Sequence, residues 1–144
     1  MDNSASRSST ASTAVNGANA GNAANAVVLV AHGSRAAVAN RAHLDLAEQL
    51  DGRIGARVIA AFMELAEPSI GDAVRLAADG GAATVVVLPY FLHPGRHQQK
   101  DIPELVAEAA ETRPGVEVRV VDHFGSDPAV LDLLAAQSDA ALET

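Results

Sequence analysis

The chain has 144 residues, 49% of them hydrophobic, and a formal net charge of −8 at pH 7. The negative charge and an aromatic content of 3% argue against a nucleic-acid-binding protein, because phosphate binding requires a basic surface and base stacking requires aromatic rings. There is no cysteine, so disulfides, iron–sulfur clusters and thiolate metal sites are excluded.

Residues 1–26 consist mainly of Ser, Ala, Asn, Thr and Gly. A segment of this composition cannot bury enough apolar area to offset the entropy lost on ordering, so we predict a disordered tail at 1–26 and one folded domain at 27–144. The N-terminus lacks the apolar stretch of a secretory signal, and no apolar run approaches the roughly 18 residues of a membrane span. We therefore expect a cytoplasmic protein that does not cross a membrane.

The first half of the predicted domain alternates between apolar runs and helical patterns. The run at 27–31 predicts a strand covered on both faces, followed by a helix at about 35–51. The run at 57–62 predicts a second strand. Pro68 is expected in the first turn of the next helix, which Gly80-Gly81 ends.

The second half repeats this alternation. Residues 84–88 predict a third strand, and a helix is expected from about Asp101 to Glu111 with Pro103 in its first turn. A fourth strand is predicted at 116–121, and Asp127-Pro128 begins a last helix that ends near Leu142. Four strand–helix repeats predict an α/β fold: a four-stranded parallel sheet with helices on both faces.

Polar residues follow the predicted strands at their carboxyl ends, the edge where such sheets bind ligands. These candidate site residues are His32, Ser34 and Arg35 after the first strand, Glu64 after the second, His93, Arg96 and His97 after the third, and Asp122 and His123 after the fourth. Gly33 would allow a ligand to approach the backbone closely. The edge is therefore the predicted functional site.

Other polar residues favour structural roles. We expect His43 on the surface or flank of the first helix, Glu67 in the first turn of the second helix, and His123 as a hydrogen-bonding loop residue. His93 and His97 have the spacing of a helical zinc pair, but Pro94-Gly95 disfavours a helix between them. Lys100 is predicted to be a solvated surface charge.

Three stretches carry a resemblance to a known family: VLVAHGSR at 28–35, AFMELAEPSI at 61–70 and VVVLPYFLHPGRHQQKDIPELV at 85–106. With these motifs the chain resembles the sirohydrochlorin chelatases, the short-form class II chelatases of cobalamin and siroheme synthesis. The resemblance implies one flavodoxin-like chelatase half, acting as a homodimer whose sheet edges face each other across the tetrapyrrole. It also implies ATP-independent insertion of a divalent metal into sirohydrochlorin, with no organic cofactor.

The family pattern places the metal-handling residues at His32, Glu64 and His97, whereas His93 departs from it. Two imidazoles and a carboxylate suit cobalt, nickel, iron or zinc, and a neutral imidazole can also accept a pyrrole proton. We expect Arg35 and Arg96 to anchor substrate carboxylates, with Ser34 and His93 as further substrate contacts. Activity should then fall as the pH drops through the imidazole range, about 6–7.

Three other functions compete with this one. A histidine phosphatase would have an arginine before the histidine of the first motif, but Ala31 stands there. A flavodoxin-like regulatory module would have an acidic cluster or a phosphate-binding loop after the first strand, and the sequence His32-Gly33-Ser34 supplies neither. The third alternative, a metal-delivery protein with the same fold, is not excluded by the sequence, because it would use the same ligand residues.

Overall fold

The computed structural model describes residues 24–144. The tail predicted at 1–26 therefore lies, apart from its last three residues, outside the described residues, and the boundary of the folded domain stays a prediction. The first strand begins at Asn25, two residues before the predicted start. No helix within residues 24–144 is long and apolar enough to cross a membrane.

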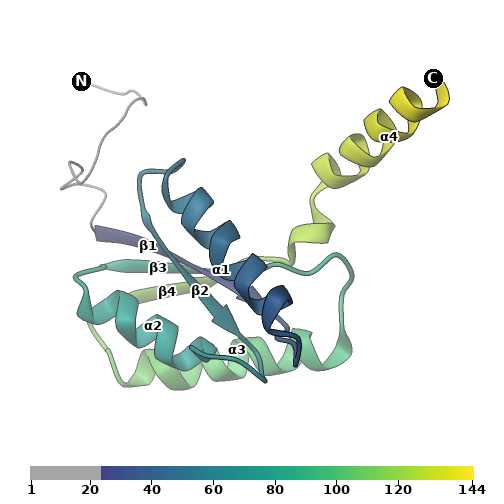
Figure 1. The fold of residues 1–144 in the computed structure, drawn as a ribbon. Helices are drawn as coiled ribbons and strands as arrows, with labels where there is room; N and C mark the ends of the chain where they lie inside the picture. Colours follow the sequence, from purple (N-terminus) through teal and green to yellow (C-terminus); the bar gives the residue numbers. More distant parts are fainter. Residues whose placement is uncertain (1–23) are drawn as a thin grey trace, which may run out of the picture.

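The sheet has four parallel strands in the order β2-β1-β3-β4 (Figure 1). The strands are β1 Asn25–Ala31, β2 Arg57–Phe62, β3 Thr84–Pro89 and β4 Glu117–Val120. Apolar runs rich in Val, with Leu and Ala, form β1 and β3 because both lie in the middle of the sheet and are covered by neighbours. The predicted four-stranded parallel sheet is confirmed.

Four α-helices and one short 3₁₀ helix, η2, complete the described chain. Their bounds are α1 Ala37–Asp51, α2 Ile70–Asp79, α3 Arg96–Glu111, η2 Phe124–Ser126 and α4 Pro128–Leu142. The last helix begins as predicted, because the Asp127 side chain caps it by accepting a hydrogen bond from the Ala129 N–H at 2.8 Å.

Two helix starts differ from the prediction. Pro68 is not in the first turn of α2, because Ser69 is the N-cap and accepts from the Asp72 N–H at 3.2 Å; Glu67 therefore lies outside the helix. Helix α3 begins five residues before Asp101, with the Gln99 N–H donating to the Gly95 carbonyl at 2.9 Å. Pro103 consequently lies inside α3, where it removes one backbone donor.

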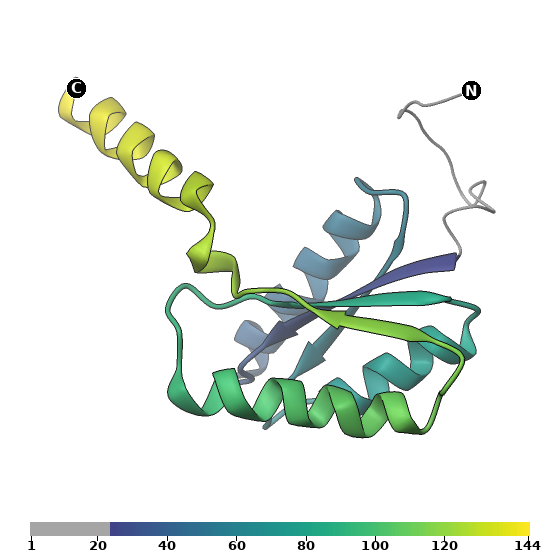
Figure 2. The same cartoon turned by 180° about the vertical axis from the view of Figure 1, so that it is seen from behind.

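The two faces of the sheet are covered by different helices (Figures 1 and 2). Helices α2 and α3 cover one face, and their main core includes Val28, Val85 and Ile70, each at most 1% exposed. Helix α1 covers the other face over β1 and β2, with Leu29 and Ala47 in a smaller core. Helices on both faces are confirmed, but α4 has no buried residue and points away from the sheet.

His43 is buried, with 6% of its surface exposed, so its predicted place on the surface or flank of the first helix is wrong. Its Nε2 donates to the Leu29 carbonyl at 2.9 Å, and its ring meets the Phe62 ring edge-on with centroids 5.2 Å apart. The buried side of α1 runs through His43 and Ala47. A histidine can occupy this apolar contact because the strand carbonyl satisfies its ring N–H.

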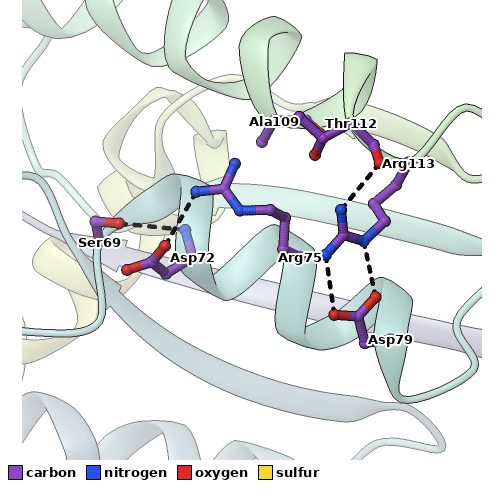
Figure 3. A network of polar contacts seen from close by, with 7 residues as sticks. All are labelled: Ser69, Asp72, Arg75, Asp79, Ala109, Thr112 and Arg113. Carbon is purple, nitrogen blue, oxygen red and sulfur yellow. Dashed lines mark hydrogen bonds and ion pairs between the residues drawn. The ribbon is translucent and has the colours of Figure 1, made fainter.

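Ion pairs connect α2 to the end of α3, as Figure 3 shows. The guanidinium of Arg113, just after α3, donates from two nitrogens to the two carboxylate oxygens of Asp79, at 2.7 and 3.0 Å. The hydrogen bond from Arg113 lowers the pKa of the Asp79 carboxyl. Arg75 makes a second, local pair with Asp72 at 3.0 Å. The Asp79–Arg113 pair helps fix α3, whose other end reaches the predicted site.

Candidate functional site

The chain brings His32 and Glu64 together by extending the pairing of β1 and β2 beyond the strand ends. The Met63 N–H donates to the Ala31 carbonyl at 2.9 Å, and the Glu64 N–H donates to the His32 carbonyl at 3.1 Å. Because the two strands are parallel, their carboxyl ends meet at one edge. Residues that follow them in the sequence are therefore neighbours in space.

The side chains of these two residues are in contact. His32 Nε2 lies 3.1 Å from Glu64 Oε2, and both side chains are more than half exposed. An ionised carboxylate only accepts hydrogen bonds, so Nε2 carries the proton in this pair. The pair therefore presents an imidazole nitrogen and a carboxylate oxygen, 3.1 Å apart, at an exposed position.

Gly33 makes this contact possible. Its φ is +99°, and a Cβ atom at this position would overlap with the backbone carbonyl of Glu64. The group that approaches Gly33 closely is thus the neighbouring turn of the protein, whereas the approach of a ligand stays a prediction. Leu65, directly after Glu64, also has a positive φ of 68°, a conformation that costs a residue with a side chain about 1 kcal/mol or more.

Ser34 and Arg35 continue the same turn toward α1. The Ser34 hydroxyl accepts from the Ala36 N–H at 3.0 Å, and its backbone exchanges two hydrogen bonds with the Asn40 side chain, at 2.9 and 2.7 Å. Asn40 is a positioning residue that was not predicted from the sequence, although a polar residue in the first turn of an otherwise apolar pattern is a usable signal. Arg35 is exposed beside this turn.

A cavity of about 550 Å³ opens beside the His32–Glu64 pair, and α3 forms its opposite wall from Arg96 to Glu108. It is lined by His32, Met63, Glu64, Gly95, Arg96, Gln98, Asp101, Glu104, Leu105 and Glu108. The structure thus brings together three of the predicted site residues, from β1, β2 and α3. His97 is the second residue of α3, between Arg96 and Gln98, but its side chain lies outside the described part of the structure.

The α3 side of the cavity is acidic. Asp101, Glu104 and Glu108 line it, with Arg96 as the one basic residue among the lining residues. These three acids were not among the predicted site residues. Their spacing, three and then four residues apart, places them on one face of the predicted helix, so the sequence carried the signal; that this face lines a cavity follows only from the packing of α3.

The remaining candidates lie elsewhere along the same edge. His123 and Asp122 line a second cavity of about 360 Å³, and the His123 carbonyl accepts from the Ser126 hydroxyl at 2.7 Å. His93 is exposed and precedes α3, so it shares no helix with His97. Within residues 24–144, no described group of three or more His, Asp or Glu side chains is arranged to hold a metal ion.

Comparisons with known proteins agree with this architecture. The CbiX family model matches residues 26–141. The chloroplastic sirohydrochlorin ferrochelatase of Arabidopsis thaliana is 38% identical over 109 residues, which cover 75% of this chain and 48% of that protein. The crystal structure of a CbiX protein from Marinobacter aquaeolei VT8 superposes with a TM-score of 0.71 at 32% identity, covering 83% of this chain and 98% of that one.

A longer solved structure matches equally well. The sirohydrochlorin chelatase SirB from Bacillus subtilis subspecies spizizenii, in complex with cobalt, gives a TM-score of 0.71 at 28% identity. The match covers 81% of this chain but 50% of SirB. The chain also spans only about half the length of the first curated relatives that it matches.

Proposed function

Because the chain belongs to the CbiX family, we propose that it inserts a divalent metal ion into sirohydrochlorin without ATP. The observation that carries the proposal is the 3.1 Å contact between His32 Nε2 and Glu64 Oε2 at the rim of a cavity. A relative named as a ferrochelatase and a SirB complex with cobalt support a metal substrate. The proposed metals are cobalt(II) or iron(II), with nickel(II) as a further candidate, and no organic cofactor takes part.

The chemistry follows from the proton balance. One divalent ion replaces two protons on ring nitrogens, so the site must present the ion and accept protons. His32 and Glu64 would hold the ion in place of the hydrogen bond between them, and once the ion passes to the ring these two side chains would be free to accept the two pyrrole protons. The proposed third ligand is His97. A site with two or three protein ligands leaves positions open for the ring nitrogens, whereas a closed four-ligand site would retain the metal.

The acidic wall gives the ion a path to this pair. Asp101, Glu104 and Glu108 supply negative charge along α3, and only Arg96 opposes it among the residues that line the cavity. A cleft lined by one sign of charge raises the local concentration of the opposite ion. The same charge repels the carboxylates of the tetrapyrrole, so the metal enters through the cavity and the ring approaches from outside it.

Basic residues at the rim serve the ring in this proposal. Arg35 is exposed beside the β1 turn and Arg96 lies at the start of α3, so both can reach carboxylates of a ring above the pair. Ser34 and His93 are the further proposed substrate contacts. The Ser34 hydroxyl accepts from the Ala36 N–H, which leaves its O–H donor and one further lone pair for the substrate.

The proposed working unit is a homodimer located in the cytoplasm, with the two sheet edges facing each other across the tetrapyrrole. The match to SirB supports this arrangement, since the aligned residues cover 50% of SirB. A second copy would supply the opposite sheet edge, which SirB can provide from its own longer polypeptide.

The test is anaerobic metal insertion into sirohydrochlorin, followed by absorbance, with cobalt(II), iron(II) and nickel(II) in turn. We expect a rate above the spontaneous one for at least one metal, and a loss of about 100-fold or more for a folded His97→Ala variant. Metal binding without accelerated insertion would instead identify a metal-delivery protein. A near wild-type rate for His97→Ala would rule out its proposed role.

A further inference from the structure

Leu65 adopts an unfavourable backbone conformation at an exposed position beside the site. Its φ is +68°, and no other residue with a side chain has a positive φ in the part of the chain that the structure describes. Glycine adopts this conformation freely and asparagine tolerates it, whereas the Cβ of a leucine opposes it. If the turn required only this conformation, glycine or asparagine would suit it better, so the leucine side chain itself has a role.

Packing within the described chain does not explain that role. Leu65 is 55% exposed, and it is absent from the hydrophobic residues that pack against the two cores. Single exposed leucines are common on protein surfaces, but this one combines exposure with backbone strain. Strained residues of this kind cluster where a protein holds a ligand. We therefore expect the Leu65 side chain to contact a ligand.

The backbone on both sides of Leu65 is fixed. Before it, the Glu64 N–H donates to the His32 carbonyl at 3.1 Å. After it, the chain returns so that the Pro68 carbonyl accepts from the Phe62 N–H at 2.9 Å, which closes the loop at its base. Phe62 is 1% exposed, so this base is anchored in the protein interior. The loop therefore holds Leu65 in one position, directly after Glu64.

Leu65 lies outside the cavity. Met63 and Glu64, the two residues before it, line the cavity, whereas Leu65 does not. In the proposed function the metal passes through the cavity and the tetrapyrrole ring approaches from outside it. The two faces of such a ring are apolar, and its carboxylates lie at the periphery. An exposed leucine beside the His32–Glu64 pair therefore matches a face of the ring and not its rim.

We propose that Leu65 is a substrate-contact residue, whose side chain packs against the apolar face of the tetrapyrrole ring above the His32–Glu64 pair. The strained backbone keeps this side chain out of the protein's own core and available to the ring. The inference rests on the proposed function for the identity of the ligand, but it concerns binding of the ring and not insertion of the metal. It predicts that a polar side chain at this position weakens ring binding without weakening the fold.

The first test measures the Kd for metal-free sirohydrochlorin by fluorescence titration of the full chain, together with the Tm of each variant. Leu65→Asn removes the apolar side chain and tolerates the positive φ, so we expect a Kd about 5–10-fold higher and a Tm at or above that of wild type. Leu65→Met keeps an apolar side chain, so we expect a near wild-type Kd. An unchanged Kd for Leu65→Asn, a Tm several degrees lower for it, or an equal loss of binding for Leu65→Met would overturn the proposal.

Leu76→Asn is the matched control, because Leu76 is 48% exposed, lies within α2 and is not among the residues that line the cavity. We expect a wild-type Kd and a lower Tm for this variant, since asparagine is a poorer helix former than leucine. An equal rise in Kd for Leu76→Asn would overturn the proposal. A changed mass of Leu65→Asn in light scattering would overturn it too, because it would assign the leucine to a contact between copies of the chain.

The result for Leu65 can be separated from the result for the proposed function. Wild-type protein that binds sirohydrochlorin without inserting metal would refute the proposed function, and the comparison of Kd values would still decide the role of Leu65. Wild-type protein that does not bind sirohydrochlorin would overturn both. Insertion by wild type with equal Kd values for all variants would overturn the role of Leu65 alone.

Discussion

The cavity has two walls that are built in different ways. The turn wall, formed by His32, Met63 and Glu64, is fixed by backbone contacts between two neighbouring strand ends and by the positive φ of the adjacent Gly33 and Leu65. The acidic wall, formed by Asp101, Glu104 and Glu108, depends on helical spacing and on solvated side chains. The difference indicates a division of roles: the turn wall sets positions, and the acidic wall sets the electrostatic field.

We expect Gly33→Ala to disrupt the turn wall more than any other single substitution considered. The new Cβ overlaps with the Glu64 carbonyl, so the two turns must separate and the His32–Glu64 contact is lost. We expect a loss of insertion activity of about 100-fold or more and a fall in the free energy of unfolding of about 3 kcal/mol, measured by urea denaturation.

Gly81→Ala is the matched control for that substitution. Gly81 has nearly the same φ, +106°, but no neighbouring atom lies within 4 Å of the point that a Cβ would occupy. The Gly81→Ala variant therefore measures the stability lost through the backbone conformation alone, without a steric clash. Equal losses of stability and activity in the two variants would show that the approach of Gly33 to Glu64 is unimportant.

Substitutions in the acidic wall should reduce activity less than Gly33→Ala does, and they should act on KM rather than on kcat. Asp101→Asn/Glu104→Gln removes two charges that line the cavity but leaves the His32–Glu64 contact in place. We expect the KM for the metal to rise by about 3–10-fold with kcat nearly unchanged, and the effect to shrink as salt is added. A large fall in kcat with an unchanged KM would instead assign these acids to the chemical step.

The smallest expected effect concerns the ion pair that holds the far end of the α3 helix. Because Arg113 lowers the pKa of folded Asp79, the pair stabilises the protein above the pKa of the unfolded carboxyl, and this contribution is lost as pH falls through the lowered pKa. Asp79→Asn should lower Tm by at most a few degrees at pH 7, and the difference from wild type should vanish in acid. A difference in Tm that persists or grows in acid would contradict this assignment.

The strands and the turn wall could be predicted from the sequence for a physical reason. Long apolar runs are strands of a covered sheet, and the ends of parallel strands must meet, so the pattern alone places His32 and Glu64 at one edge. The family to which the resemblance pointed is confirmed. The ligand role of His97 stays a prediction.

Other features depend on tertiary contacts that a local pattern does not contain. His43 is buried because a strand carbonyl accepts its ring N–H. Helix α3 begins before Asp101 even though Pro103 favours a first-turn position, because the helical hydrogen bonds already start at Gly95. The collision that forbids a side chain at Gly33 involves a residue 31 positions away and appears only in the folded chain.

The most direct test of the account compares insertion rates of three folded variants: His32→Ala, Glu64→Gln and Glu117→Gln. Glu117 is an exposed glutamate at the opposite end of the sheet, paired with Arg119, and so provides the matched control for Glu64. We predict a loss of about 100-fold or more in kcat/KM for the first two and wild-type activity for the third. If His32→Ala and Glu64→Gln both insert metal at the wild-type rate, the pair is not the metal-handling centre.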